Sequence, residues 1–326
     1  MNLLDIKPNI VSKGVKGKYF LFYGDPSTRK TTVASQFPKA LLLATEIGYS
    51  MIPGVHAAPV KSWAEFRDIV RQLKGDAVQN AYETIVIDTV GLLTDMCMKY
   101  ICDKNGVAEL SEVPWGGGWT QFKKEFRTQI NTIAQLGYGV VFIAHADVKK
   151  DNETGKITSA LPMMDKKPRE SVIALVDFIF FLQKETKDGS DKDVTVYAYS
   201  KLPSIETKTR ARHLSPRFEF NFENLEAEIV KAIEAHEVNG NGKSLVTDEV
   251  VNLHTQNVSM PFEELRAATL EIARELTTHE LPDVVTQATH QITAIMKGVR
   301  ISEATPAHYD SLETLKEALY EIKANI

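Results

Sequence analysis

A short segment near the N-terminus combines the residue types that bind phosphate. It follows a continuous apolar run at residues 19–23 and opens a stretch that can form a helix from Lys30 to Phe37. Backbone N–H groups and a helix N-terminus supply partial positive charge, a lysine neutralises phosphate oxygens, and a hydroxyl coordinates Mg²⁺. The residues of this candidate loop are Gly24, Asp25, Pro26, Ser27, Thr28, Arg29, Lys30, Thr31 and Thr32.

The candidate loop departs from the pattern G-x-x-x-x-G-K-[ST] at one position, because Arg29 stands where the second glycine is expected. If that position requires φ > 0, a non-glycine residue costs about 1 kcal/mol or more. Arg29 also offers an additional cation to a phosphate. The alternative is a basic turn that opens an ordinary helix.

Three further polar residues follow apolar runs that we interpret as strands. Asp88 ends Thr-Ile-Val-Ile-Asp, Glu46 follows Leu-Leu-Leu-Ala-Thr, and His145 ends Val-Val-Phe-Ile-Ala-His. With Thr31, Asp88 is a candidate Mg²⁺ ligand; a carboxylate at Glu46 can polarise an attacking water, and His145 can contact a terminal phosphate. The alternatives are ordinary turn residues for the two carboxylates and a core or turn histidine.

The elements that position these residues alternate between strand and helix, which predicts an α/β fold with a mainly parallel sheet. We expect strands at 19–23, 40–45, 83–88 and 139–145, and helices at 62–73, capped by Ser62, at 90–103 and at 120–136. Residues 105–118 are rich in turn formers, and 146–169 read as a long polar loop. Strands at 176–182 and 194–199 suggest a hairpin through 187–190, and residues 262–277, 282–296 and 311–324 show helical spacing.

Composition excludes several protein classes. The chain has 326 residues, 43% hydrophobic residues and a formal net charge of −5, which excludes a disordered chain and a disulfide-stapled miniature. No apolar run is long enough to span a bilayer and no signal peptide is recognisable, so we expect no membrane association and a cytoplasmic location. Cys97 and Cys102 lie in one predicted helix, which favours reduced thiols and argues against a zinc site.

Charge is unevenly distributed along the chain. Residues 245–326 contain 13 acidic and 6 basic residues, whereas residues 1–244 contain 32 basic and 30 acidic residues. Between them, the Gly- and Asn-rich residues 239–244 suit a flexible linker. We therefore predict a nucleotide-binding core at 1–238, a linker at 239–244 and an acidic helical region at 245–326.

Taken together, these residues resemble the RecA-like core of P-loop ATPases, and more narrowly the phage-encoded RecA-like proteins of single-strand annealing and recombination. The resemblance covers about residues 15–222. It implies a RecA-like P-loop NTPase fold for the core, to which the helical spacing beyond residue 262 adds a C-terminal α-helical region. The resemblance further implies ATP and Mg²⁺ as cofactors, ATP hydrolysis, and the host cytoplasm as location. It also implies that Glu46 is the catalytic base and that His145 is a sensor. The motifs that carry it are 24–32, 44–48, 84–89, 115–119, 140–145 and 208–210.

The same resemblance extends to the Lys-x-Arg pair at Lys208 and Arg210. In several relatives such a pair reaches the ATP of the neighbouring subunit, where an arginine finger contributes roughly 10³–10⁵ in rate. This implies a homo-oligomer, either a ring or a filament. The alternative is a solvated basic edge, since residues 201–217 include five basic residues and one acidic residue.

Binding of single-stranded DNA is implied mainly by the family. Trp115 and Trp119 flank three glycines and could stack on bases, with packing of both rings onto the core as the alternative. Lysines at 149, 150, 166 and 167 lie in a segment that also contains four carboxylates, so the patch is mixed. The candidate DNA-binding residues are Trp115, Trp119, Lys149, Lys150, Lys166 and Lys167.

Two other functions remain open at this point. A nucleotide-dependent interaction module would dock the acidic helices onto a replication or recombination partner, and a hexameric helicase-like motor would unwind duplexes. Among the DNA reactions themselves, annealing, strand exchange and unwinding are not distinguished by the residues.

Overall fold

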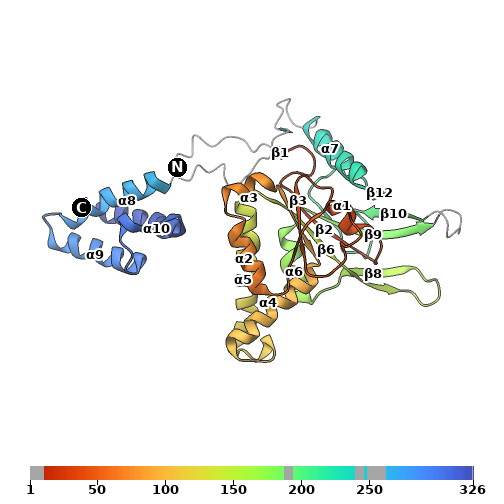
Figure 1. Cartoon of the computed structure of the whole chain (residues 1–326), viewed down its shortest axis with the longest axis horizontal. Helices are drawn as coiled ribbons and strands as arrows, with labels where there is room; N and C mark the ends of the chain where they lie inside the picture. Colours follow the sequence, from red (N-terminus) through yellow and green to blue (C-terminus); the bar gives the residue numbers. More distant parts are fainter. Residues whose placement is uncertain (1–10, 187–193, 239–245, 248–261, 325) are drawn as a thin grey trace. The chain divides into compact units, whose positions relative to one another are not determined.

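The computed structural model describes residues 11–186, 194–238, 246–247, 262–324 and 326. The chain divides into two compact units, residues 1–256 and 257–326. The N-terminal unit is an α/β structure, and the C-terminal unit consists of helices (Figure 1). The predicted architecture, an α/β core with a mainly parallel sheet plus a C-terminal helical region, is confirmed. Within the described ranges, no helix has the length and apolar character that crossing a membrane demands.

The N-terminal unit is built on one nine-stranded sheet with the order β12-β10-β9-β2-β6-β5-β3-β4, with β11 also paired to β9. From β9 to β4 all neighbouring strands are parallel, whereas β10, β11 and β12 are antiparallel additions. The strands are β2 (Tyr19–Gly24), β3 (Ala40–Ala44), β4 (His56–Pro59), β5 (Thr84–Asp88), β6 (Gly139–Ala144), β9 (Phe178–Thr186), β10 (Val194–Tyr199), β11 (Lys208–Thr209) and β12 (Arg217–Glu219).

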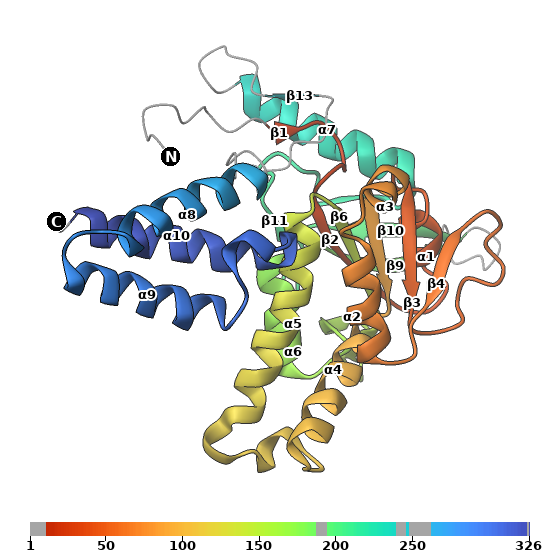
Figure 2. The same ribbon diagram turned by 60° about the vertical axis from the view of Figure 1, so that its left-hand side comes forward.

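Helices cover both faces of this sheet, as Figures 1 and 2 show. One face packs against α1 (Lys30–Ala34) and α7 (Phe222–Val238). The other packs against α2 (Trp63–Gln72), α4 (Val90–Asn105), α5 (Gly117–Gln135) and α6 (Lys166–Leu175). The remaining short helices of the unit are α3 (Asp76–Ala81), η2 (Leu110–Glu112) and η3 (Pro114–Gly116).

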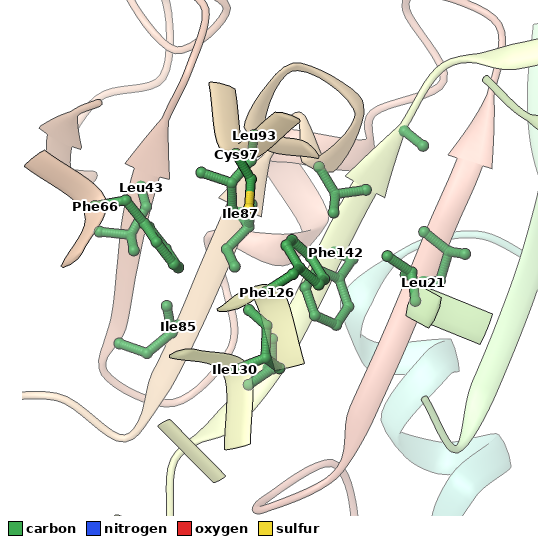
Figure 3. Close-up of a cluster of buried hydrophobic side chains, with 14 of the residues drawn as sticks. Leu21, Leu43, Phe66, Ile85, Ile87, Leu93, Cys97, Phe126, Ile130 and Phe142 are labelled. Carbon is green, nitrogen blue, oxygen red and sulfur yellow. The ribbon is translucent and has the colours of Figure 1, made fainter. Parts of the chain in front are cut away.

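The central strands are buried on both faces, which explains why they read as continuous apolar runs. In β2, Leu21 and Tyr23 pack into the core beneath α4 and α5, while Phe20 and Phe22 pack on the α1 and α7 side. Figure 3 shows the first of these cores. Its labelled side chains come from β2, β3, β5, β6 and helices α2, α4 and α5: Leu21, Leu43, Phe66, Ile85, Ile87, Leu93, Cys97, Phe126, Ile130 and Phe142.

Local signals for two helices are confirmed. The Ser62 hydroxyl accepts a hydrogen bond from the Glu65 N–H at 3.2 Å and so caps α2 as predicted. Cys97 and Cys102 both lie in α4 as free, buried thiols, and burial raises the pKa of both.

The prediction of a long loop over residues 146–169 is wrong. This segment forms an antiparallel hairpin of β7 (Ala146–Lys150) and β8 (Ile157–Pro162), followed by the start of α6. Its charged residues obscured the alternation that turns Val148, Ile157 and Ala160 toward the core. Helix α3 and strands β4 and β12, whose apolar patterns are short, are also absent from the prediction. Helix α7 is absent from it as well, although Leu225, Ile229 and Ala232 recur at helical spacing.

The C-terminal unit contains three main helices around a core of its own. Leu265, Ile272 and Leu276 of α8 pack with Leu312, Leu315 and Leu319 of α10. Its helices are α8 (Phe262–Thr277), α9 (Pro282–Met296) and α10 (Tyr309–Ala324), with η4 (Ile301–Glu303) and η5 (Pro306–His308) between the last two. The first two have the predicted bounds.

Two predicted segments lie outside the described residues: the linker 239–244 and, within the N-terminal unit, the hairpin turn 187–190. Strand β13 (Val246–Thr247) pairs in parallel with β1 (Val11–Ser12). Residues just beyond 245 therefore associate with the N-terminal unit, and the division between the units falls later than the predicted start of the helical region.

Gly24, the last residue of β2, gives a test of the tight contact between β2 and β9. A Cβ atom at Gly24 would lie 2.3 Å from the carbonyl oxygen of Leu182. We expect Gly24→Ala to lower the free energy of unfolding by about 1–3 kcal/mol, because backbone must shift to admit the methyl group. Denaturant unfolding followed by tryptophan fluorescence measures this, since Trp63, Trp115 and Trp119 all belong to the N-terminal unit.

Gly75→Ala is the matched control, because a Cβ atom there would meet its nearest neighbour, the Gln72 carbonyl oxygen, at 3.4 Å. Equal stabilities of the two variants would contradict this account of Gly24.

Candidate nucleotide-binding site

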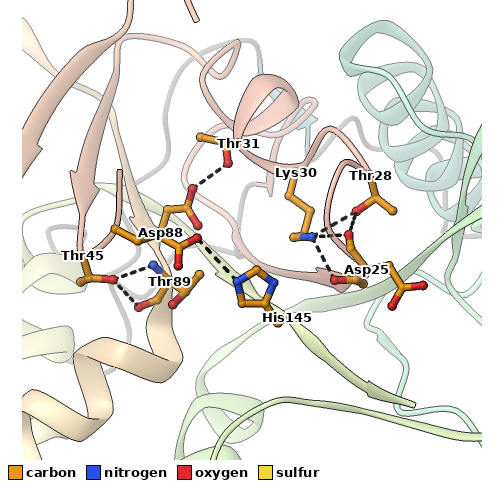
Figure 4. A network of polar contacts seen from close by, with 10 residues as sticks. Asp25, Thr28, Lys30, Thr31, Thr45, Asp88, Thr89 and His145 are labelled. Carbon is orange, nitrogen blue, oxygen red and sulfur yellow. Dashed lines mark hydrogen bonds and ion pairs between the residues drawn. The ribbon is translucent and has the colours of Figure 1, made fainter. Parts of the chain in front are cut away.

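The polar strand ends predicted from the sequence meet at one edge of the sheet. Strands β2, β6, β5 and β3 are parallel neighbours, so the loop at 24–32, His145, Asp88 and Glu46 all follow or occupy carboxyl ends on the same edge. Figure 4 shows the polar contacts among these groups. Ligands bind at this edge in open α/β sheets, where helix N-termini and loop N–H groups converge.

Lys30 is buried and its ammonium group is held by oxygens of the loop. Nζ donates to the carbonyl oxygens of Gly24 at 2.9 Å and Asp25 at 2.8 Å, and to Thr28 Oγ1 at 3.1 Å. Burial lowers the pKa of Lys30 to about 8, against the raising effect of nearby carboxylates, chiefly Asp88. Phosphate oxygens are acceptors of the same kind and carry charge, so they can replace these loop oxygens and favour the ammonium form.

The backbone of the loop explains the cost of Arg29. Arg29 precedes α1 with φ 60° and ψ 20°, and Ser27 also has a positive φ of 61°. The position of the expected second glycine therefore does adopt the left-handed conformation that disfavours side chains with a Cβ atom. The Arg29 side chain is exposed beside the buried Lys30.

Thr31 and Asp88 form the pair that fits a magnesium ion. Thr31 Oγ1 donates to Asp88 Oδ2 at 2.6 Å, which joins the first turn of α1 to the end of β5. Asp88 is buried, and burial raises its pKa although the Thr31 hydrogen bond acts in the opposite direction. A hydroxyl and a carboxylate next to a phosphate-binding lysine are the hard oxygen ligands that Mg²⁺ takes together with phosphate and water. The residues therefore fit the ion that the fold implies.

Glu46 and His145 lie next to each other, with His145 Nε2 3.6 Å from Glu46 Oε1. Both side chains are about one-third exposed, and both line a pocket of about 540 Å³ whose wall also includes Thr89, Gly91 and Asp95. This arrangement gives a carboxylate access to water at the edge of the site.

Thr45 is a residue of the site that sequence reasoning missed. Its backbone N–H donates to the Asp88 carbonyl oxygen at 2.7 Å, and its hydroxyl accepts from the Thr89 N–H at 2.8 Å. It thereby ties the end of β3, just before Glu46, to the end of β5. The position of Thr45, directly between an apolar strand and Glu46, is the sequence feature that could have indicated its role.

Lys208 and Arg210 are not brought to this edge within one chain. Lys208 in β11 pairs with Ile179 near the amino end of β9, and its Nζ donates to the Ile173 carbonyl oxygen at 2.8 Å. Arg210 Nε lies 3.2 Å from Asp177 Oδ1, just before β9. Burial lowers the pKa of Lys208. Both residues lie toward the end of the sheet opposite the phosphate-binding loop.

The candidate DNA-binding residues have different environments. Trp115 has an exposed fraction of 103%, at the tip of the α4–α5 hairpin that extends beyond the sheet (Figure 2). Trp119 is half-buried against the core, with Lys167 Nζ 4.4 Å from its ring centroid. The remaining lysines, all exposed, lie on β7 and at the start of α6: Lys149, Lys150 and Lys166.

The left-handed backbone at Arg29 predicts a stabilising substitution. Arg29→Gly removes the steric cost of φ 60° and should raise the free energy of unfolding by about 1 kcal/mol. Arg29→Lys keeps both a Cβ atom and the charge and should leave stability unchanged. Denaturant unfolding of the three proteins decides the matter; a gain in the lysine variant equal to that of the glycine variant would contradict strain as the cause.

Comparison with known proteins places this geometry in a family. A family model described as AAA domain matches residues 16–211. The SPbeta prophage-derived uncharacterized protein YorG of Bacillus subtilis (strain 168) is 27% identical over 335 residues, covering 99% of each chain.

Solved structures that the chain resembles include the RadB recombinase, with 16% identity, a TM-score of 0.37 and coverage of 64% of this chain and 88% of that one. A KaiC-like protein of Pyrococcus horikoshii OT3 has 14% identity, a TM-score of 0.38 and coverage of 66% and 95%. Since the family model spans more than half of the sequence, the chain belongs to the AAA domain family.

Proposed function

We propose that this protein binds and hydrolyses ATP with Mg²⁺ and uses this cycle on single-stranded DNA, in annealing or strand pairing during phage recombination or replication. The observation that carries the nucleotide part is the buried Lys30 beside the Thr31–Asp88 pair, at the end of parallel strands. A lysine, a hydroxyl and a carboxylate in this order form the minimal set that a magnesium-bound triphosphate requires.

Each residue of the site has a defined task in this proposal. Lys30 exchanges its loop oxygens for the β- and γ-phosphate oxygens, while Thr31 and Asp88 hold the ion. When bound, Mg²⁺ neutralises charge that develops on the phosphate oxygens. Glu46 accepts a hydrogen bond from the attacking water and orients it, and His145, 3.6 Å from Glu46, contacts the terminal phosphate.

The DNA part of the proposal is supported by exposure and residue type. The fully exposed Trp115 offers both faces of its ring to a base, and the lysines at 149, 150, 166 and 167 are exposed on β7 and α6. Base stacking and backbone charge are the two contributions that single-strand binding combines. Trp119 is already partly packed, so it contributes less exposed ring surface.

The positions of Lys208 and Arg210 support a proposal of oligomerisation. Because they lie away from the loop of their own chain, a role at the transferring phosphoryl group requires another copy of the protein. We propose such a homo-oligomer, a ring or a filament, in the cytoplasm of the host.

The ATPase assignment predicts separate effects of two substitutions. Lys30→Ala should abolish ATP binding and hydrolysis, because the loop loses the charge that neutralises the phosphates. Glu46→Gln should keep ATP binding within about twofold and lower kcat at least about 100-fold, since general-base contributions are of order 10²–10⁴. Steady-state phosphate release and equilibrium nucleotide binding measure both. Hydrolysis that is unaffected by Lys30→Ala would refute the assignment of the loop.

The DNA assignment predicts that Trp115→Ala weakens binding of single-stranded DNA by about 1–3 kcal/mol, whereas Trp115→Phe retains most of the affinity. Fluorescence anisotropy with a labelled oligonucleotide, with and without ATP and across a salt series, is the measurement. Tyr320→Ala, an exposed aromatic residue of the C-terminal unit, is the control. Absence of DNA binding at low salt would favour the nucleotide-dependent interaction module, and duplex unwinding would favour the motor.

A further inference from the structure

Strand β9 continues past the phosphate-binding loop and carries a lysine there. Leu182 of β9 pairs with Gly24, the residue at which β2 ends, and β9 extends to Thr186. Lys184 therefore lies two residues beyond the start of the loop, on the strand adjacent to it. At about 3.3 Å per residue, its backbone is roughly 7 Å further along the strand direction.

The side chain of Lys184 belongs to the face of the sheet that α1 covers. Phe178, Phe180 and Leu182 pack in the same cluster as Val33 of α1. Alternation along β9 places Lys184 on this face, because it follows Leu182 by two residues. Lys184 is exposed, whereas the apolar residues that precede it are buried. Lys184 thus lies on the face of the sheet that α1 covers, at an exposed position of the strand next to the loop.

The pKa of Lys30 agrees with this position of Lys184. The pKa of Lys30 is lowered mainly by burial, and Lys184 is a further positive charge that lowers it. Among the residues that the structure describes, Lys184 forms no ion pair. Two lysines that repel each other beside the exposed Arg29 create positive potential that a polyphosphate would neutralise.

We propose that Lys184 is a nucleotide-binding residue that contacts the non-transferred phosphates, α and β, of the nucleotide held by its own chain. The order of the strands in the sheet indicates which phosphates Lys184 contacts. Asp88, Glu46 and His145 belong to β5, β3 and β6, on one side of β2, whereas Lys184 belongs to β9 on the other side. The terminal phosphate faces the first group, so Lys184 meets the phosphates nearer the ribose. This assignment rests on the proposed function.

Such a contact has a characteristic kinetic consequence. Since ATP and ADP share the α- and β-phosphates, a contact to these groups contributes to the binding of both nucleotides. Negative charge grows on the β-phosphate as the γ-phosphate leaves, so a contact that includes the β-phosphate also contributes, to a smaller extent, to kcat. A residue that acts only on the γ-phosphate or on the attacking water would instead lower kcat without weakening the binding of ADP.

The experiment measures binding of fluorescent N-methylanthraniloyl ATP and ADP, and steady-state ATP hydrolysis, with the full-length protein at low salt. We expect Lys184→Gln to raise Kd for both nucleotides by the same factor, about three- to tenfold, and to lower kcat by a smaller factor. Lys184→Arg should restore most of the affinity, and Lys184→Glu should raise Kd further. Lys74→Gln removes an exposed lysine remote from the loop and serves as the charge-matched control.

The outcomes separate this inference from the function on which it rests. Unchanged Kd values in Lys184→Gln, or a fall in kcat alone, would overturn the role of Lys184. The nucleotide site itself would still stand if the wild-type protein bound nucleotide and Lys30→Ala did not. Failure of the wild-type protein to bind either nucleotide would overturn both. If Lys184→Gln and Lys74→Gln lost the same amount of nucleotide affinity, the effect would be one of net charge only, and the role of Lys184 would be overturned.

Discussion

Gly24 ends β2 opposite Leu182 of β9, and Asp88 ends β5 opposite Ala44 of β3 and Ile143 of β6. Asp88, Glu46 and His145 depend directly on this parallel register, because each of them lies within two residues of a strand end. A slip of one residue would move Asp88 by about 3.3 Å and turn it to the other face. Apolar side chains on both faces of these strands oppose such a slip. It would move each side chain from the core on one face of the sheet to the core on the other face, where it does not fit the existing packing.

How much of this arrangement can be predicted from the sequence depends on how strongly each segment is buried. The runs that became β2, β3, β5 and β6 are apolar on both faces, so their polar endings stood out, and parallel pairing then brought them together. The hairpin of β7 and β8 buries only one face and carries charges on the other, which made it resemble a loop. Lys184, like Asp88, comes after a run of buried apolar residues. Strand β9 continues past Lys184 to Thr186, however, so the sequence shows no strand end at this lysine.

Position relative to the loop also distinguishes the basic residues from one another. Lys30 opens α1 and contacts Gly24 at the carboxyl end of β2, and Lys184 lies near the carboxyl end of the adjacent β9, whereas Lys208 and Arg210 lie toward the amino end of β9. Arg210 pairs with Asp177, and its side chain is 62% exposed, so leaving this ion pair costs little, about 0–1 kcal/mol. Lys208 is held by a backbone carbonyl in a partly buried position. Of the two, Arg210 is therefore the residue more readily released toward a second copy of the chain.

Tyr23 connects the phosphate-binding loop to two distant segments. Its buried hydroxyl lies 3.1 Å from the carbonyl oxygen of Ala160 in β8 and 2.7 Å from that of Glu206, two residues before Lys208. A buried hydroxyl without a partner costs about 1–3 kcal/mol. The base of the β7–β8 hairpin and the chain leading to Lys208 therefore stay attached to the strand that ends at Gly24. A nucleotide-linked displacement of either segment has to preserve these contacts or replace them within the same buried space.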